Sequence, residues 1–300
     1  MEGAKNFKYT LGKENSFKTK AVSGLVRLPL IGAPGPRRNQ SYEKIPAAWA
    51  APTRPKDAII PTTYSMEFSF EVPGAPPILG ALLELALGAA NGGVFAIADV
   101  LPSFTFFKAG ALKSEAISGC KVRAFRIGSA DGAQALRLAF DVVGSAQEFE
   151  SAPTAIPAFA SGLAPLIHKG SALTVGGGAF RVNSVMLSGA WVFDEADFKA
   201  SDTRASLGED GLVVAGEILC DWDAATFNAF QDRLGSGASV ALAQNWSSGP
   251  KSLLAEAPAI IVQEIRPLDE RARAKQLIRF ECADSAPGAK DAIKFTLNLS

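Results

Sequence analysis

The feature that most constrains this chain is a strand-and-helix pattern that occurs once in each half. Residues 64–88, YSMEFSFEVPGAPPILGALLELALG, alternate apolar and polar side chains and then continue with apolar residues at helical spacing. Residues 212–235, LVVAGEILCDWDAATFNAFQDRLG, follow the same plan in nearly the same length. Alternation predicts a strand, and the wider spacing predicts a helix. The sequence therefore predicts a mainly β protein with two similar halves.

In the first copy of the pattern, particular residues mark where the strand and the helix begin and end. The apolar residues of 64–70 occupy one face of the strand, and the polar residues between them occupy the other. Pro77 suits the first turn of the helix, and Gly88 is placed to cap its end. Further along, residues 130–132, Ala-Asp-Gly, predict a hairpin turn because Asp-Gly tolerates positive φ angles.

Further strands are expected where β-branched and aromatic residues lie between turn residues. In the second copy, Asp223 is placed as the N-cap of a helix over residues 223–234. The remaining expected strands cover residues 103–107, 120–127, 135–143, 179–187, 189–193, 239–244, 259–265, 275–283 and 293–299.

Domain organisation follows from the repeat and from the passage between its copies. Residues 150–166, ESAPTAIPAFASGLAPL, are rich in Ala, Pro and Ser, which is typical of a linker. We therefore expect a first domain over residues 1–150, a linker over 151–170 and a second domain over 171–300.

Within the first domain, residues 10–62 are expected to form an extended arm. Frequent prolines between Pro29 and Pro61 break any long helix or central strand. The segment nevertheless contains too many apolar residues, such as Ile31 and Trp49, for a free disordered tail. Two interpretations remain open: the arm becomes ordered against a neighbouring molecule, or it wraps on its own domain.

Residues that commonly carry catalysis are scarce. His168 is the single histidine, no second histidine or nearby cysteine completes a metal site, and we expect it at an exposed position or turn. No serine or cysteine lies in a nucleophile elbow. The run Gly176-Gly177-Gly178 lacks the lysine of a phosphate-binding loop. We therefore expect no catalytic residue, no metal ligand, no cofactor and no enzyme activity.

Composition gives no support to nucleic-acid binding, secretion or membrane insertion. The chain has 30 basic and 30 acidic residues, so no net charge attracts nucleic acid. Cys120, Cys220 and Cys282 form no CxxC pair, which favours buried thiols over a disulfide framework. The N-terminus lacks the apolar segment of a signal peptide, and the apolar run 76–90 is shorter than the roughly 20 residues that span a membrane. We expect a soluble protein that is not exported.

Several phrases of the sequence resemble one protein family. They are SFTFFKAG (103–110), GCKVRAFRIGSADG (119–132), ALRLAFDVVGS (135–145), AFRVNSVMLSGAWVFDEADF (179–198) and GLVVAGEILCDWDAATFNAFQDRLGSGASVAL (211–242). With the order of elements, they resemble the tail tube proteins of long-tailed bacteriophages, in the larger form that carries two tube domains in one chain. The resemblance covers most of the chain, from Lys8 to Leu299.

The resemblance implies an antiparallel β-sandwich or barrel with a flanking helix in each half. It also implies a virion protein that assembles in the host cytoplasm into rings, which stack into the hollow tail tube that delivers the genome. Three duplicated chains would give a trimeric ring with pseudo-sixfold symmetry, and a ring of six chains remains open. The other partners implied are further tail proteins: the tape measure, terminator and baseplate proteins.

A tube that conducts DNA sets a condition on its inner wall. Clustered Lys and Arg would bind phosphates and retain DNA, so the wall should be acidic or neutral. Glu67 and Glu71 share one face of a predicted strand, and Glu217 and Asp221 share one face of its counterpart. We expect these four residues to face the lumen, with DNA passing through without specific binding.

Two alternatives to the tail tube remain open at this point. Another ring-forming virion protein, such as a tail terminator or baseplate component, would assemble into a single ring. A carbohydrate-binding or hydrolytic β-sandwich module would need an aromatic platform or a pair of carboxylates in a cleft.

Overall fold

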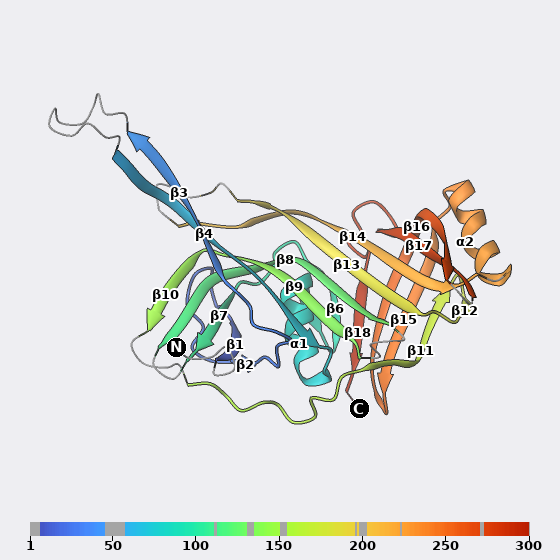
Figure 1. The fold of residues 1–300 in the computed structure, drawn as a ribbon, viewed down its shortest axis with the longest axis horizontal. Helices are drawn as coiled ribbons and strands as arrows, with labels where there is room; N and C mark the ends of the chain where they lie inside the picture. Colours follow the sequence, from blue (N-terminus) through green and yellow to red (C-terminus); the bar gives the residue numbers. More distant parts are fainter. Residues whose placement is uncertain are drawn as a thin grey trace.

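The described residues fold into long antiparallel strands and two helices (Figure 1). Eighteen strands within the described ranges are joined edge to edge. The mainly β fold predicted from the sequence is confirmed. The computed structural model describes residues 7–45, 58–110, 113–130, 135–150, 155–195, 197, 203–222, 224–270 and 273–299.

The elements of the first half are β1 (Lys8–Lys13), β2 (Val26–Arg27), β3 (Arg37–Ile45), β4 (Ala58–Pro73), α1 (Pro76–Leu87), β5 (Gly88–Asn91), β6 (Val94–Ile97), β7 (Phe104–Ala109), β8 (Ser114–Ala130), β9 (Arg137–Gly144) and β10 (Ala146–Glu150). Those of the second half are β11 (Ile167–Val175), β12 (Gly178–Phe180), β13 (Ser184–Asp194), β14 (Gly208–Asp221), α2 (Ala224–Ser236), β15 (Val240–Ser248), β16 (Lys251–Glu270), β17 (Arg273–Ala283) and β18 (Lys294–Asn298).

Helix α1 begins and ends where the sequence predicts. Pro76 and Pro77 stand in its first turn, where a missing N–H leaves no hydrogen bond unmade. Gly88 takes a φ of 97°, and its N–H donates to the carbonyl of Glu84. Leu83 and the other large apolar side chains of the helix are buried, so α1 forms part of the first half's core.

The two halves share one pattern of strand pairing. The same seven pairings occur in each half, in the same order along the chain, so every strand of the second half has a counterpart in the first. Among the described residues, the β5–β6 hairpin of the first half has no counterpart in the second. The shared pairings are β1–β2, β1–β7, β3–β4, β4–β9, β7–β8, β8–β9 and β8–β10, and correspondingly β11–β12, β11–β15, β13–β14, β14–β17, β15–β16, β16–β17 and β16–β18.

The correspondence extends to the register of the longest strands, β8 and β16. Each pairs through its first part with β7 or β15 and through its last part with β9 or β17. The β8–β9 ladder shifts between Val122 and Ala124, and the β16–β17 ladder shifts between Val262 and Glu264. Because a bulge bends its strand, each long strand changes partners beside an equivalent irregularity.

Two ladders join the halves: β8 pairs with β13, and residues 94–96 of β6 pair with residues 294–296 of β18. Residues 124–130 of β8 pair with residues 184–190 of β13. The sheet therefore runs without a break in the order β3-β4-β9-β8-β13-β14-β17-β16. On its core side the join needs a glycine, because a Cβ on Gly189 would stand 2.4 Å from the ring of Phe125.

The strands predicted in this part of the chain are wrong. Two strands are predicted, over residues 179–187 and 189–193, but the structure has one continuous strand, β13, preceded by the short β12. The error comes from Gly189, because an interior glycine marks either a break or a close approach of a neighbour. Here it marks the close approach of Phe125.

Other bounds also differ: β8 and β16 extend well beyond the predicted strands at residues 120–127 and 259–265. Strand β11 begins at Ile167, inside the segment expected to be a linker. The hairpin turn expected at Asp131 and Gly132 and the N-cap expected at Asp223 lie outside the described residues.

The segment expected as an arm, residues 10–62, divides into two parts. Its first part lies on its own chain, because β1 pairs with β7, and Leu11 and Leu28 are buried in the core. Its second part is the β3–β4 hairpin, whose far end projects away from the rest of the molecule (Figure 1). Residues 46–57 lie outside the described residues.

All three cysteines are free and buried, as the sequence predicts. Burial, with the nearby Glu281 carboxylate, raises the pKa of the Cys282 thiol to about 12. Burial also raises the pKa of Cys120 well above its ordinary value. Buried neutral thiols of this kind act as small apolar side chains.

Candidate assembly surface

The joined sheet is hollowed on the face opposite the core. A groove of about 490 Å³ crosses five neighbouring strands, β8, β13, β14, β17 and β16. Its lining includes the outward side chains Arg126, Met186, Glu217, Gln263 and Arg279. We call this side of the sheet the concave face. Because the groove crosses strands rather than lying between loops, it follows the curvature of the sheet itself.

The structure places all four residues predicted to face a lumen on the concave face. Glu67 and Glu71 alternate with the buried Phe68, Phe70 and Val72 on β4. Likewise, Glu217 and Asp221 alternate with the buried Ile218 and Cys220 on β14. Side chains of a strand point alternately to its two faces, so the carboxylates of both halves share one surface.

Three of these carboxylates are paired with arginines that the sequence analysis did not single out. Arg123 Nη2 lies 3.2 Å from Glu67, and Arg137 Nη1 lies 3.1 Å from Glu71. Arg279 contacts both Glu217, at 2.7 Å, and Glu264, at 3.0 Å. The hydrogen bond from Arg279 to Glu217, together with the charges of both glutamates, raises the pKa of its guanidinium.

For Arg279, the signal that identifies the contact is the cross-strand register. Arg279 lies directly opposite Glu217, and Glu264 lies directly opposite Arg279 on the other side. Opposite charges directly across a pair of strands stabilise each other. Without knowledge of which strands pair, the sequence gives no means to find this row.

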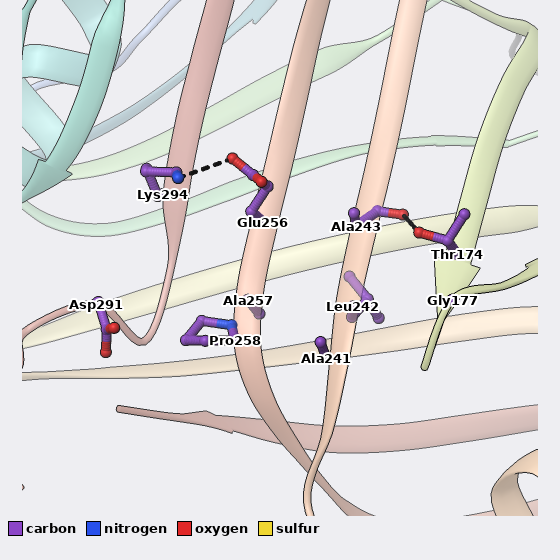
Figure 2. A pocket seen from close by; sticks show the side chains of 10 residues that line it. All are labelled: Thr174, Gly177, Ala241, Leu242, Ala243, Glu256, Ala257, Pro258, Asp291 and Lys294. Atoms are coloured by element: carbon purple, nitrogen blue, oxygen red, sulfur yellow. Dashed lines mark hydrogen bonds and ion pairs between the residues drawn. The ribbon is translucent and has the colours of Figure 1, made fainter. Parts of the chain in front are cut away.

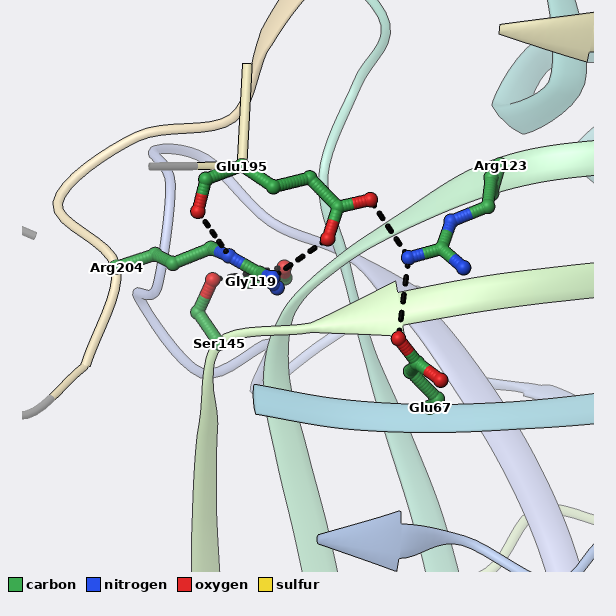
Figure 3. A network of polar contacts seen from close by, with 6 residues as sticks. All are labelled: Glu67, Gly119, Arg123, Ser145, Glu195 and Arg204. Carbon is green, nitrogen blue, oxygen red and sulfur yellow. Dashed lines mark hydrogen bonds and ion pairs between the residues drawn. The ribbon is translucent and has the colours of Figure 1, made fainter. Parts of the chain in front are cut away.

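Polar contacts reinforce the join between the halves (Figure 3). Glu195, in the connection between β13 and β14, accepts hydrogen bonds from Arg123, at 2.6 Å, and from Arg204, at 2.6 Å. Arg204 also donates to the backbone carbonyl of Glu195, at 2.9 Å. Burial lowers the pKa of the Arg204 guanidinium. The β13–β14 connection of the second half thus reaches over the first half.

A buried ion pair lies in the same join. Lys121 of β8 donates to the Glu209 carboxylate of β14 and to the carbonyl of Leu207, the latter at 2.7 Å. Glu209 also accepts a hydrogen bond from the backbone N–H of Leu101, at 3.1 Å. The side chains of Lys121 and Glu209 are only 7% and 5% exposed. A pair so deeply buried needs these added hydrogen bonds to offset the lost hydration.

His168 is buried, and the expectation of an exposed histidine is wrong. Its Nε2–H donates to the carbonyl of Val182, at 3.0 Å, so Nδ1 accepts from the hydroxyl of Ser129, at 2.9 Å. Ser129 in turn accepts from Trp246 Nε1–H, at 2.7 Å. The chain Trp246–Ser129–His168 links β15, β8 and β11. These hydrogen bonds could not be predicted from the sequence, because the residues that form them are far apart along the chain.

A second cavity lies on the second half, beside β15 and β16 (Figure 2). Its volume is about 250 Å³, and none of its ten lining residues is aromatic. Glu256 is paired with Lys294 at 3.0 Å, and Asp291 accepts hydrogen bonds from Ser285. The stacking platform that a sugar-binding site needs is missing from this cavity.

The described residues contain neither a metal-binding cluster nor a membrane-spanning helix. No cluster of three or more His, Cys, Asp or Glu residues in that part of the chain could hold a metal ion. Neither described helix is long and apolar enough to cross a membrane. No protein-family model matches the chain, and no curated protein shows significant similarity to it.

The buried pair in the join gives a first prediction. Lys121→Met or Glu209→Met alone leaves one charge buried without its partner, so each should lower the free energy of unfolding by about 3–5 kcal/mol. The double variant removes both charges and should recover most of that loss. Urea unfolding measures all three changes.

A surface pair provides the control for this measurement. Lys290 and Asp99 also form an ion pair, but their side chains are 50% and 76% exposed. Lys290→Met should therefore cost less than about 1 kcal/mol. Additive losses from the two single changes at Lys121 and Glu209 would contradict the coupling.

Proposed function

We propose that this protein is a structural virion protein, the building block of a bacteriophage tail tube. Copies of the chain assemble into rings, and the rings stack into the hollow tube through which the genome passes to the host. Tape measure, terminator and baseplate proteins are its further partners in the tail. No enzymatic step is part of this function.

The observation that carries the proposal is the continuous sheet with its concave face. Its eight strands, four from each half, end at β3 on one side and at β16 on the other. Unpaired strand edges promote pairing with another chain, and closure into a barrel is the arrangement that removes them. A curved sheet with an open edge at each end is suited to become one segment of a closed wall.

The matching strand pairings of the two halves support the ring that we propose. If each half is one tube domain, a chain contributes two equivalent segments to the wall. Three chains then give six segments around one axis, with pseudo-sixfold symmetry. The proposed domains are residues 1–150 and 171–300, with the connection between them in 151–170.

The charges of the concave face suit a wall along which DNA moves. Glu67, Glu71, Glu217 and Asp221 are proposed to face the lumen. Of the arginines on this surface, Arg123, Arg137 and Arg279 are held by carboxylates, whereas Arg126 has no ion-pair partner among the described residues. An arginine that is already paired has less to gain from a phosphate, and the carboxylates repel the DNA backbone.

Negative-stain electron microscopy of the purified protein tests the proposal. We expect hollow tubes or stacked rings, with sixfold modulation in end-on views, because both sheet edges must find partners. Isolated rings that never stack would favour a terminator or baseplate component. Monodisperse monomers at every concentration would overturn self-assembly and leave a β-sandwich binding module.

The ion pairs of the concave face give a separate prediction. Glu217→Gln with Glu264→Gln removes both partners of Arg279, so we expect DNA to bind roughly tenfold more tightly at low salt. A filter-binding assay at several salt concentrations measures the change. Glu256→Gln is the matched control, because it releases Lys294 beside the other cavity. Equal DNA binding by the unmodified protein, the double variant and the control would contradict the proposed role of the ion pairs.

A further inference from the structure

We infer that the joint between neighbouring copies repeats the joint between the two halves of one chain. Strand β3 of one copy adds to the free edge of β16 in the next copy, in the register that β13 adopts on β8. This inference rests on the proposed self-assembly and specifies the two surfaces and the alignment that carry it.

The β8–β13 ladder within the chain is the template; the short β6–β18 ladder is not part of it, because the β5–β6 hairpin has no counterpart among the described residues of the second half. In the template, Ala190 of β13 lies opposite Ala124 of β8, and Ser188 lies opposite Arg126. β13 is the counterpart of β3, because both pair with the strand that leads into the helix, β14 or β4. By the same comparison β16 is the counterpart of β8. The same joint between copies therefore requires β3 to meet β16.

Both edges needed for this joint are open. Residues 261–270 of β16 pair with β17 on one side, and no described strand pairs with them on the other. Strand β3 likewise pairs only with β4 among the described residues. Ile265 of β16 is half-buried, whereas its counterpart Phe125 is 1% exposed beneath β13. Ile265 is therefore an apolar side chain left partly uncovered at the position where β13 covers Phe125.

The β3–β4 hairpin has a shape that fits this role. In the second half, the connection that follows β13 reaches over the first half, with Glu195 bound to Arg123 and Thr203 bound to Lys18. The corresponding segment of the first half, the β3–β4 hairpin, projects away from the rest of the molecule (Figure 1). In the proposed joint this hairpin lies over the second half of the next copy.

The register follows from the shared bulge positions. Setting Val122 and Ala124 equivalent to Val262 and Glu264 aligns β8 with β16. The same alignment carries over from β9 and β17 to β4 and β14 and makes Glu67 equivalent to Ala215. Arg37 lies opposite Glu67 and Ser188 lies opposite Ala215, so β3 is aligned with β13. The resulting contacts between copies are Arg37 with Arg266, Arg38 with Ile265 and Asn39 with Glu264. Arg38 takes the place of Gly189 in this register, and the smaller Ile265 takes the place of the Phe125 ring that requires the glycine within the chain.

Two features of the sequence bear on this register. Pro36 falls opposite Pro267, so the two residues without an N–H group meet and neither leaves a donor unpaired. Arg37 falls opposite Arg266, an unfavourable pair of like charges, with Glu264 one position away on the same face. The joint therefore combines backbone pairing with a local charge arrangement that substitutions can change.

Disulfide trapping tests the joint. Asn39→Cys and Glu264→Cys in one chain are placed at opposite ends of its sheet, so a bond between them joins different copies. Under mild oxidation we expect a ladder of covalent oligomers on a denaturing gel, formed at least tenfold faster than with Asn39→Cys and Leu268→Cys. The latter pair keeps the same face but is out of register.

A second pair guards against a folding defect. Arg37→Cys with Arg266→Cys tests the same register, leaves the Glu264–Arg279 ion pair intact and removes the two like charges. The native cysteines are buried in the folded chain. Rapid disulfide formation by both in-register pairs supports the joint. If the out-of-register pair forms its disulfide at the same rate, the joint is wrong.

The outcome also separates this inference from the proposed function. If the unmodified protein forms tubes and neither in-register pair is trapped, the β3–β16 joint is wrong while the tail-tube function stands. If the unmodified protein stays monomeric and no pair is trapped, both are wrong.

Discussion

The backbone ladder between β8 and β13 is the interaction on which the rest of the molecule depends. It joins two units with matching strand pairings into one sheet and so gives the concave face its width. Gly189 admits the ring of Phe125 on one side of this ladder, and Lys121 and Glu209 lie buried beside it. Without the ladder, β8 and β13 would each have an open edge, and the groove would lose the wall that Arg126 of β8 provides.

The sequence predicts the parts of this fold that depend on local pattern. The alternating strand at residues 64–73 and the capped helix α1 follow from side-chain periodicity, proline and Gly88. The four carboxylates were found on one surface because alternation fixes the face of each strand. Their arginine partners could not be found, because those contacts depend on which distant strands lie side by side. The burial of His168 was missed for the same reason, since Ser129 and Trp246 are remote in sequence.

Charge and shape on the concave face have a common physical basis. A sheet that is curved by bulges brings its outward side chains together on the hollow side, where unpaired charges would act on anything that passes. Carboxylates and arginines placed opposite each other across strands, such as Glu217 and Glu264 with Arg279, neutralise each other locally. Exposed apolar residues such as Met186 and Val213 occupy part of the same face. The surface therefore offers neither a cluster of free cations nor a deep pocket to hold a ligand.

In the proposed assembly, the joint within one chain is repeated between chains until the sheet closes. The mass of the assembled protein, measured by native mass spectrometry across a range of concentrations, tests this most directly. Two equivalent segments per chain and six around the axis predict a smallest closed species of three chains, with larger species in multiples of three. A protein that stays monomeric, or that closes as dimers or tetramers, would contradict the account.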